Sequence, residues 1–271
     1  MIGKYGCGRV RKGTENLMEL TTAILILLTG LVAGFFNTVA GGGSLLTLPV
    51  LIFLGLPPVI ANATNRVAIA VQNIFAVTGF KRKGVSNMRY SIFLAVSATL
   101  GAIIGAKIAL DIKGEDFERI LSIVMVMVLI LILWNPTRKR TKDKELMNTR
   151  RQITGVIVFF FVGIYGGFIQ VGVGFIILAA LTLVNGLDLL KANSIKVGVV
   201  LVYTLAAVVI FAYEGKIYWV YGLVLSIGNA AGGWIGSHWA VSKGEKWIRR
   251  LLIVAVALMA IKLSGLLKFL G

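Results

Sequence analysis

Long apolar segments alternate with short polar stretches along almost the whole chain. Runs such as Leu20–Phe36, Ile120–Trp134, Ile153–Phe168 and Val197–Tyr213 approach the roughly 20 residues that a helix needs to cross a bilayer. Polar and apolar residues do not alternate with the period of two that marks a transmembrane β-barrel. The pattern therefore predicts an all-α integral membrane protein with several spans.

The two halves of the chain are similar to each other, which indicates an internal duplication. When the second half is laid over the first, Gly34 meets Gly163, Gly43 meets Gly172, and Ala63-Thr64-Asn65 meets Ala192-Asn193-Ser194. The predicted domains are a first transmembrane repeat over 19–134, a polar basic linker over 135–151 and a second transmembrane repeat over 152–271. Each repeat reads as five apolar segments, at about 19–40, 44–56, 59–80, 90–111 and 117–134, and at about 152–169, 173–186, 190–213, 217–240 and 247–269.

The second segment of each repeat is short and follows a break in an apolar stretch. The break is Gly41–Gly43 in the first repeat and Gln170–Gly174 in the second. Each glycine costs about 1 kcal/mol relative to alanine in a helix interior. A break at membrane depth is tolerated only where protein buries it or where it lines a wet cavity. The breaks therefore predict broken or re-entrant half-helices and a site between the repeats.

The course of the short segments decides how the repeats are oriented. If these segments cross the membrane, each repeat has five spans, and the odd number inverts the second repeat relative to the first. The basic stretches Lys81–Lys83, Arg138–Arg151 and Lys243–Arg250 then share the cytoplasmic side, as the positive-inside rule prefers. We favour this inverted arrangement over re-entrant segments, which would give four spans per repeat. Its basic N-terminal leader is exterior unless Met18 is the true start.

The formal net charge of +17 has a topological explanation, because the excess of Lys and Arg lies in short loops. We therefore expect no nucleic-acid partner. Cys7 is the only cysteine and His238 the only histidine, so the sequence offers no Cys/His set for a metal, and it contains no P-loop motif. Every acidic residue lies in a loop or at a segment end, which leaves no carboxylate pair for catalysis within a span. The sequence predicts neither an enzyme nor a cofactor.

Two basic residues lie within predicted spans at nearly corresponding places, Arg66 in the first repeat and Lys196 in the second. A charge at the bilayer centre costs about 2.5–3.5 kcal/mol on insertion scales, and no acidic residue near them in sequence offsets it. A bound anion would offset this cost, whereas snorkelling of the side chains to the interface would avoid it. Lys107 and His238 are also repeat-related, and for them we prefer snorkelling and packing respectively.

The N-terminus of a helix offers unpaired N–H groups and the positive end of the helix dipole. Broken helices in transporters direct such ends at anionic substrates. The predicted anion site comprises the two breaks, the buried cations and nearby neutral donors: Asn37, Gly41, Gly42, Gly43, Ser44, Asn65, Arg66, Gln170, Gly172, Gly174, Asn193, Ser194 and Lys196. The GxxxG pairs Gly101/Gly105 and Gly232/Gly236 instead predict close packing of helices through small residues.

The first break and its surroundings read GFFNTVAGGGSLLTLPVLIFLGLPPVIANATNRVAI, which resembles the N-terminal signature of the TauE/SafE sulfite exporter family. The resemblance is carried by Gly41–Gly43, by Pro49 and by the turn Ala63-Thr64-Asn65. A weaker copy, GGFIQVGVGFIILAALTLVNGLDLLKANSIKV, has Gln170 and Val171 in place of glycines and no proline at the place of Pro49. The resemblance extends over nearly the whole chain and implies a transporter of small anions such as sulfite or sulfoacetate.

These observations together predict a multi-pass transporter of the cell membrane that moves sulfite or an organosulfonate by alternating access between the repeats. Three alternatives stay open: a passive anion channel, a transporter that holds Na⁺ through backbone carbonyls at the breaks, and a membrane enzyme or sensor. A membrane enzyme or sensor would need a nucleophile–base pair or a cofactor motif, and the sequence contains neither. The expected partners are a small inorganic or organosulfur anion and the lipid bilayer, and assembly into a homo-oligomer is left open.

Overall fold

The computed structural model describes residues 20–85, 88–112, 114–134 and 148–263. These residues form helices and turns without a strand, so the all-α prediction is confirmed for them. The helices are α1 (Leu20–Val39), α2 (Ser44–Phe53), α3 (Pro58–Arg82), α4 (Met88–Asp111), α5 (Gly114–Trp134), α6 (Thr149–Phe168), α7 (Val173–Asn185), α8 (Leu189–Tyr213) and α9 (Trp219–Leu263). The predictions about Met18, most of the linker and the end of the last segment lie outside the described residues.

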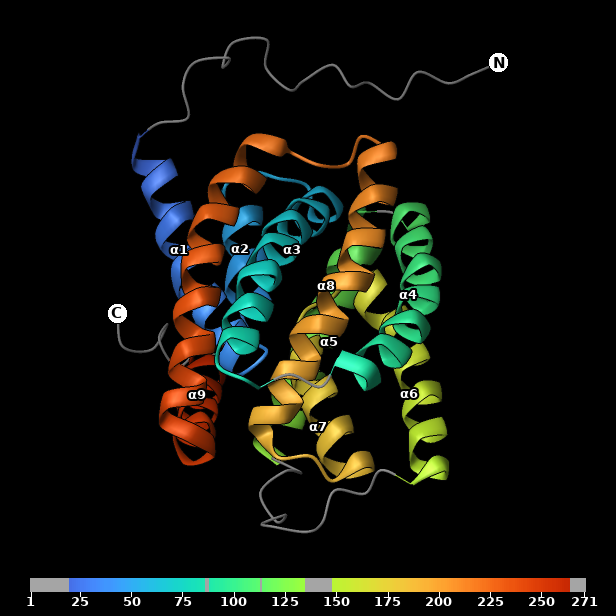
Figure 1. Cartoon of the computed structure of the whole chain (residues 1–271). Coiled ribbons are helices and arrows are strands. Elements are labelled where there is room, and N and C mark those ends of the chain that lie inside the picture. The colour runs from blue at the N-terminus through green and yellow to red at the C-terminus, as the bar shows by residue number, and fades with distance from the viewer. Residues whose placement is uncertain (1–19, 86–87, 113, 135–147, 264–271) are drawn as a thin grey trace.

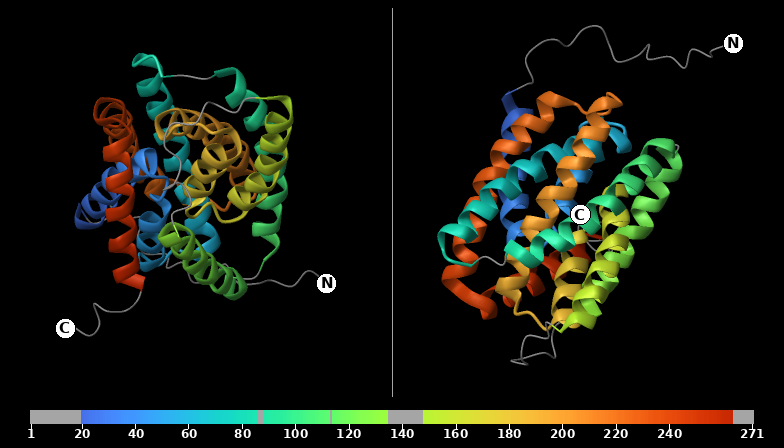
Figure 2. Two further views of the ribbon diagram at one scale, coloured as in Figure 1. Left: turned by 90° about the horizontal axis from the view of Figure 1, so that it is seen from below. Right: turned by 45° about the vertical axis from the view of Figure 1, so that its right-hand side comes forward.

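The helices match the predicted segments within a few residues, except that the last two segments form one helix. α9 continues over 45 residues. The polar stretch Ser242–Lys246 contains a single glycine, which weakens a helix by only about 1 kcal/mol. A straight helix of this length would measure about 68 Å, more than twice the thickness of the hydrocarbon core. Accordingly, Figure 2 shows the red end of α9 running in a different direction from its orange start.

Two helical hairpins contain the breaks: α1 with α2, and α6 with α7. A Cβ on Gly43 would lie 2.2 Å from the carbonyl oxygen of Ala33, so the start of α2 lies beside α1. At the other hairpin, Arg151 near the start of α6 donates to the carbonyl oxygen of Val184 near the end of α7, at 2.9 Å. The short helices therefore run back toward the ends at which α1 and α6 begin.

The two hairpins enter the protein from opposite ends. In Figure 1, α1 begins at the top of the view and α6 begins at the bottom. An inverted repeat requires this relation. The two-repeat arrangement stays a prediction, which the course of the hairpins supports.

Apart from α5, the described helices form two bundles whose members come from both halves of the chain. The most extensive contacts join α1 and α3 to α9, and α6 and α8 to α4, and Figure 1 shows these two groups on the left and on the right. We call α1, α2, α3 and α9 the α9 bundle, and α4, α6, α7 and α8 the α4 bundle. The α9 bundle thus contains the first three helices of the first half together with α9 from the second half. The α4 bundle contains the first three helices of the second half together with α4 from the first half.

Glycine lets the helices of each bundle touch through their backbones. A Cβ on Gly105 would lie 2.0 Å from a carbonyl oxygen of α6, and a Cβ on Gly232 would lie 2.1 Å from a carbonyl oxygen of α1. Gly101 and Gly236 lie in the same two contacts. The prediction of close packing at the GxxxG pairs is therefore confirmed.

The outer surface of the bundles is apolar. Among the described helices, α1, α6, α8 and the part of α4 from Tyr90 to Asp111 are long and apolar enough to cross a membrane. Large apolar side chains such as Leu28, Phe93, Phe161 and Val209 point outward from these four helices. Because hydrocarbon accepts such a surface and water does not, the fold is that of a multi-pass integral membrane protein.

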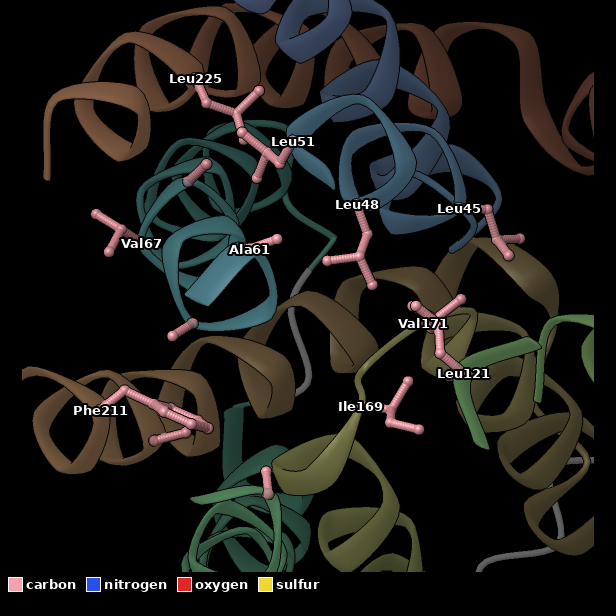
Figure 3. Packing of buried hydrophobic residues seen from close by; sticks show 14 of the residues in the cluster. Leu45, Leu48, Leu51, Ala61, Val67, Leu121, Ile169, Val171, Phe211 and Leu225 are labelled. Atoms are coloured by element: carbon pink, nitrogen blue, oxygen red, sulfur yellow. The ribbon is translucent and has the colours of Figure 1, made fainter. Parts of the chain in front are cut away.

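Buried apolar side chains surround the hairpin tips (Figure 3). Leu45 and Leu48 of α2, Ile169 and Val171 of the second break, and Phe211 of α8 belong to one cluster. Side chains from both halves of the chain thus form a shared core around the breaks, which excludes lipid from the irregular backbone there.

The two ends of the molecule differ in charge. Where α3 ends and α6 and α8 begin, the exposed or half-exposed charges among the described residues include Lys81, Arg82, Lys83, Arg150, Arg151, Asp188 and Lys191. At the opposite end, the exposed charges include Lys107, Asp111, Glu115, Asp116, Arg119, Glu214 and Lys216. From the positive-inside rule we expect the first, basic end to face the cytoplasm.

Candidate functional site

The tips of the two hairpins touch in the interior of the protein. A Cβ on Gly41 would lie 2.5 Å from the carbonyl carbon of Gly174, and a Cβ on Gly174 would lie 2.3 Å from the Cα of Gly41. Gly41 also has a φ of +94°, a conformation that glycine adopts without strain. Gly42 faces the ring of Phe175, which a Cβ would approach to 2.6 Å. The glycines of the breaks therefore allow backbone contact between the hairpins.

Gln170 occupies the place in the second break that Gly41 occupies in the first. Its φ is 64°, and no other described non-glycine residue has a positive φ. The left-handed conformation costs about 1–2 kcal/mol for a residue with a Cβ. Hydrogen bonds of the side chain offset this strain: Oε1 accepts from Arg66 at 2.7 Å, and Nε2 donates to Thr204 at 3.0 Å. The departure from glycine thus provides a buried polar side chain at the second tip.

Arg66 of α3 binds the C-terminal end of α6. Its Nη1 and Nη2 donate to the carbonyl oxygens of Gly166 and Gly167 at 2.8 and 2.7 Å. The guanidinium lies over the ring of Phe211, 5.1 Å from its centroid, and the side chain is fully buried. A cation is stabilised by the negative end of a helix dipole. The end of α6 therefore offsets the charge of Arg66, and snorkelling to the interface does not occur.

Lys196 of α8 binds the C-terminal end of α1 in the corresponding way. Its Nζ donates to the carbonyl oxygens of Asn37 and Thr38 at 2.8 and 3.0 Å and to Asn193 Oδ1 at 2.6 Å. Asn193 donates in turn to the carbonyl oxygen of Val39 at 3.0 Å. Lys196 is 2% exposed, so its ammonium does not reach the interface either. Side chains from the opposite half of the chain thus cap both helices that run into the breaks.

The N-terminal ends of α2 and α7 lack such caps. No side chain caps either helix, whereas Asn148 caps α6 and Asp188 caps α8. The first N–H groups of a helix have no partner within it, and a buried helix end needs one from elsewhere. Two positive helix ends without a side-chain cap therefore meet at the contact between the tips.

A small cavity lies at this contact. Its lining comprises Asn37, Ser44, Ile69, Asn73, Gln170, Val173, Gly174, Lys196 and Val200. The centre of a water molecule can occupy about 10 Å³ of it, which is about the room for one ordered water. Any larger ligand requires the tips to separate. The lining residues include Lys196 and Ser44 but no Asp or Glu, which suits an anion.

The structure brings part of the predicted site to the cavity. The predicted residues in its lining are Asn37, Ser44, Gln170, Gly174 and Lys196. Four further predicted glycines form the breaks beside it: Gly41, Gly42, Gly43 and Gly172. Arg66 and Asn193 bind helix ends, as described above.

Asn65 and Ser194 are predicted site residues whose side chains make hydrogen bonds away from the cavity. Asn65 Oδ1 accepts a hydrogen bond from Thr47 at 2.7 Å. Ser194 Oγ donates to the carbonyl oxygen of Val85 at 2.7 Å, beyond the end of α3. Neither residue lines the cavity.

Two residues of α3 belong to the polar surroundings of the cavity although the sequence did not single them out. Asn73 lines the cavity. Gln72 accepts from Asn37 Nδ2 at 3.0 Å and donates to Thr38 Oγ1 at 3.2 Å. Both lie about two helical turns beyond Arg66 within an apolar segment. This spacing, which places polar residues near the same side of one helix, could have indicated from the sequence that they lie near the site.

His238 and Lys107 have no part in the site. His238 Nδ1 lies 2.9 Å from the carbonyl oxygen of Trp234, and the ring centroids of these two residues are 4.3 Å apart. Lys107 is exposed and lies four residues before the end of α4 at Asp111. The structure thus agrees with the preferred explanations, packing for the histidine and snorkelling for the lysine.

The fold and the cavity define a class: a multi-pass helical membrane protein in which the tips of two helical hairpins enclose a small interior cavity. The family model described as sulfite exporter TauE/SafE matches residues 26–263, and the chain belongs to this family. A protein of Haemophilus influenzae named "Probable membrane transporter protein" is 28% identical over 248 residues, which cover 91% of this chain and 96% of the relative. The "Probable membrane transporter protein YfcA" of Escherichia coli K12 is 27% identical over 257 residues, covering 92% and 93%. No solved structure matches the chain.

Proposed function

We propose that this membrane transporter carries a small anion, sulfite or an organosulfonate such as sulfoacetate, and binds it between the hairpin tips. One observation carries the proposal: side chains cap the negative ends of α1 and α6, while the positive ends of α2 and α7 meet without a side-chain cap beside Lys196. A Na⁺ site at the breaks is disfavoured, because the carbonyl oxygens at the ends of α1 and α6 already accept bonds from cations. The description of the family as sulfite exporters supports the substrate class.

We further propose that access alternates through movement of the α9 bundle against the α4 bundle. The sequence predicts rocking of one repeat against the other. However, the most extensive helix contacts join the repeats to each other, and rocking the repeats would break them. Movement of the bundles preserves these contacts and separates the hairpin tips, which belong to different bundles. The tips must separate before the cavity can admit an anion.

Uptake of labelled sulfite into proteoliposomes tests the proposal. We expect saturable uptake that rises when unlabelled sulfite or sulfoacetate is trapped on the opposite side, because a carrier exchanges its substrate and a simple pore does not. Lys196→Met should reduce this uptake, whereas Lys107→Met, which removes an exposed lysine, should leave it unchanged. Uptake without stimulation from the opposite side would indicate the channel. Absence of sulfite and sulfonate uptake would refute the proposed substrate class.

A further inference from the structure

Lys196 contacts both the end of α1 and the cavity. Its Nζ carries three protons, and each has an acceptor, at 2.8, 3.0 and 2.6 Å. Two of these acceptors are backbone carbonyls of α1, and the third is Asn193 on α8. The same side chain also lines the cavity between the hairpin tips. Lys196 therefore binds a helix end and borders the cavity that Asn37, one of its partners, also lines.

Arg66, the corresponding cation of the first half, contacts a helix end but does not line the cavity. Its terminal nitrogens bond to two carbonyl oxygens of α6 and to Gln170. The guanidinium lies over Phe211, and Arg66 is absent from the cavity lining. Of the two buried cations, Lys196 alone can exchange a helix end for a ligand.

We infer that Lys196 is a positioning residue that responds to the substrate: its ammonium holds the end of α1 in the empty carrier and turns to the anion when the anion binds. The inference rests on the proposed anion site. Since all three protons are in use, a direct bond to the anion requires Lys196 to release one acceptor. The bond that Lys196 gives up joins its ammonium to a neutral carbonyl oxygen, whereas a bond to the anion joins two opposite charges. In the low dielectric of the protein interior this added Coulomb attraction favours the exchange.

Release of α1 by Lys196 weakens the boundary between the bundles. Lys196 lies on α8 in the α4 bundle, whereas the carbonyls that it holds lie on α1 in the α9 bundle. The bond from Asn193 to Val39 stays in place, so the end of α1 keeps one cap during the exchange. Binding of the anion thus loosens the contact across which the bundles must move. An empty carrier stays closed, which limits movement without substrate.

Distances between spin labels on the two bundles test this inference by pulsed electron paramagnetic resonance. Cysteines replace exposed residues in a Cys7→Ser background. One pair, Lys83→Cys and Arg150→Cys, reports on the basic end of the molecule. A second pair, Phe53→Cys and Tyr213→Cys, reports on the opposite end. Each pair joins the α9 bundle to the α4 bundle.

We expect sulfite to change the distance distribution of at least one pair in the otherwise unmodified protein. Lys196→Met should show the changed distribution without sulfite and should bind sulfite about 10- to 100-fold more weakly, since a bond to a charged group is lost. Lys107→Met, which loses a lysine outside the site, should behave like the unmodified protein. The inference is overturned if Lys196→Met keeps the distribution of the empty carrier and still responds to sulfite.

The melting temperature of the same samples separates this inference from the proposed function. If sulfite raises the melting temperature but leaves both distances unchanged, the inference fails and the anion site stands. If neither sulfite nor sulfoacetate binds or is transported, the proposed function and the inference both fail. Should Lys196→Met not fold, Lys196→Gln replaces it. Its amide still offers α1 a donor, so we expect the distances of the empty carrier without sulfite. Because it has no charge, we expect weakened sulfite binding and no change of either distance when sulfite is added, and a normal response to sulfite would overturn the inference.

Discussion

At the end of α6, Arg66 donates to two backbone carbonyls and lies over the ring of Phe211. At the end of α1, Lys196 donates to two backbone carbonyls and lines a cavity. Arginine holds two acceptors in a rigid planar fork, whereas the ammonium of lysine is compact and changes partners more easily. Corresponding places in the two halves thus hold a fixed contact in one case and an exchangeable one in the other.

This difference shows that corresponding residues of two similar halves can have different roles, one structural and the other in ligand binding. Both cations solve the same problem, the capping of a helix that ends at membrane depth, where water is absent. Lys196 lines the cavity between the hairpin tips, and we propose that it supplies the positive charge of the anion site. The other, Arg66, is fully buried beneath the ring of Phe211 and does not line the cavity.

The largest effect is expected where the two hairpins touch. Gly41→Ala should lower the free energy of unfolding by about 3–5 kcal/mol, because a Cβ would overlap the backbone of Gly174 and the conformation is left-handed. Gly55→Ala is the matched control, since Gly55 has a similar φ of +90° but no atom within 4 Å of the place that a Cβ would occupy. It should cost only about 1–2 kcal/mol. Melting temperatures in detergent would contradict the tip contact if both variants lost the same stability.

The next effect concerns the fixed cation. Arg66→Met should lower the free energy of unfolding by about 3 kcal/mol or more, because Gly166, Gly167 and Gln170 each lose a donor in a buried place. Thermal unfolding followed by intrinsic fluorescence measures the loss. A variant as stable as the unmodified protein would contradict the role of Arg66 in holding α6.

The exchangeable cation should matter less for stability. Lys196→Met should cost about 1–2 kcal/mol, because a water molecule in the cavity can donate to the carbonyl oxygens of Asn37 and Thr38 in place of the ammonium. The comparison of Lys196→Met with Arg66→Met under the same conditions gives the sharper test. If Lys196→Met were the less stable of the two, the assignment of fixed and exchangeable contacts would be reversed.

The smallest effect on stability is expected at the start of α2. Ser44 Oγ donates to the carbonyl oxygen of Gln170 at 3.3 Å, a long bond, so Ser44→Ala should lower stability by only about 0.5 kcal/mol. Its affinity for sulfite should nevertheless fall several-fold, because the hydroxyl lines the cavity. Ser242→Ala, at an exposed serine of α9, is the control and should bind sulfite like the unmodified protein. Equal affinities of both variants for sulfite would show that Ser44 is not part of the site.

The sequence allowed most helices to be predicted, because apolar runs of bilayer length and glycine-rich breaks are local signals. It failed at α9, where the break around Gly244 proved too weak to end the helix. Which helix packs on which could not be predicted either. The pairing of α1 with α9 and of α6 with α4 depends on contacts between residues far apart in the chain.

The candidate site could be predicted only in part for a similar reason. Spacing along the chain identified Arg66 and Lys196 as corresponding basic residues within spans, but left open whether they are buried or reach the interface. It could not reveal that a helix end of the other half lies opposite each of them. Asn73 lies on α3 about two turns beyond Arg66, a spacing that the sequence shows, but only the fold reveals that this part of α3 borders the cavity.

Binding of anions to the purified protein tests the central claim most directly. Sulfite, thiosulfate, sulfate, sulfoacetate, chloride and Na⁺ are compared at matched ionic strength, because a ligand of the folded state stabilises it by RT ln(1 + [L]/Kd). We predict that sulfite or sulfoacetate raises the melting temperature of the unmodified protein and of Lys107→Met, and that Lys196→Met loses this response. A response to Na⁺ alone, or an undiminished anion response in Lys196→Met, would contradict the account.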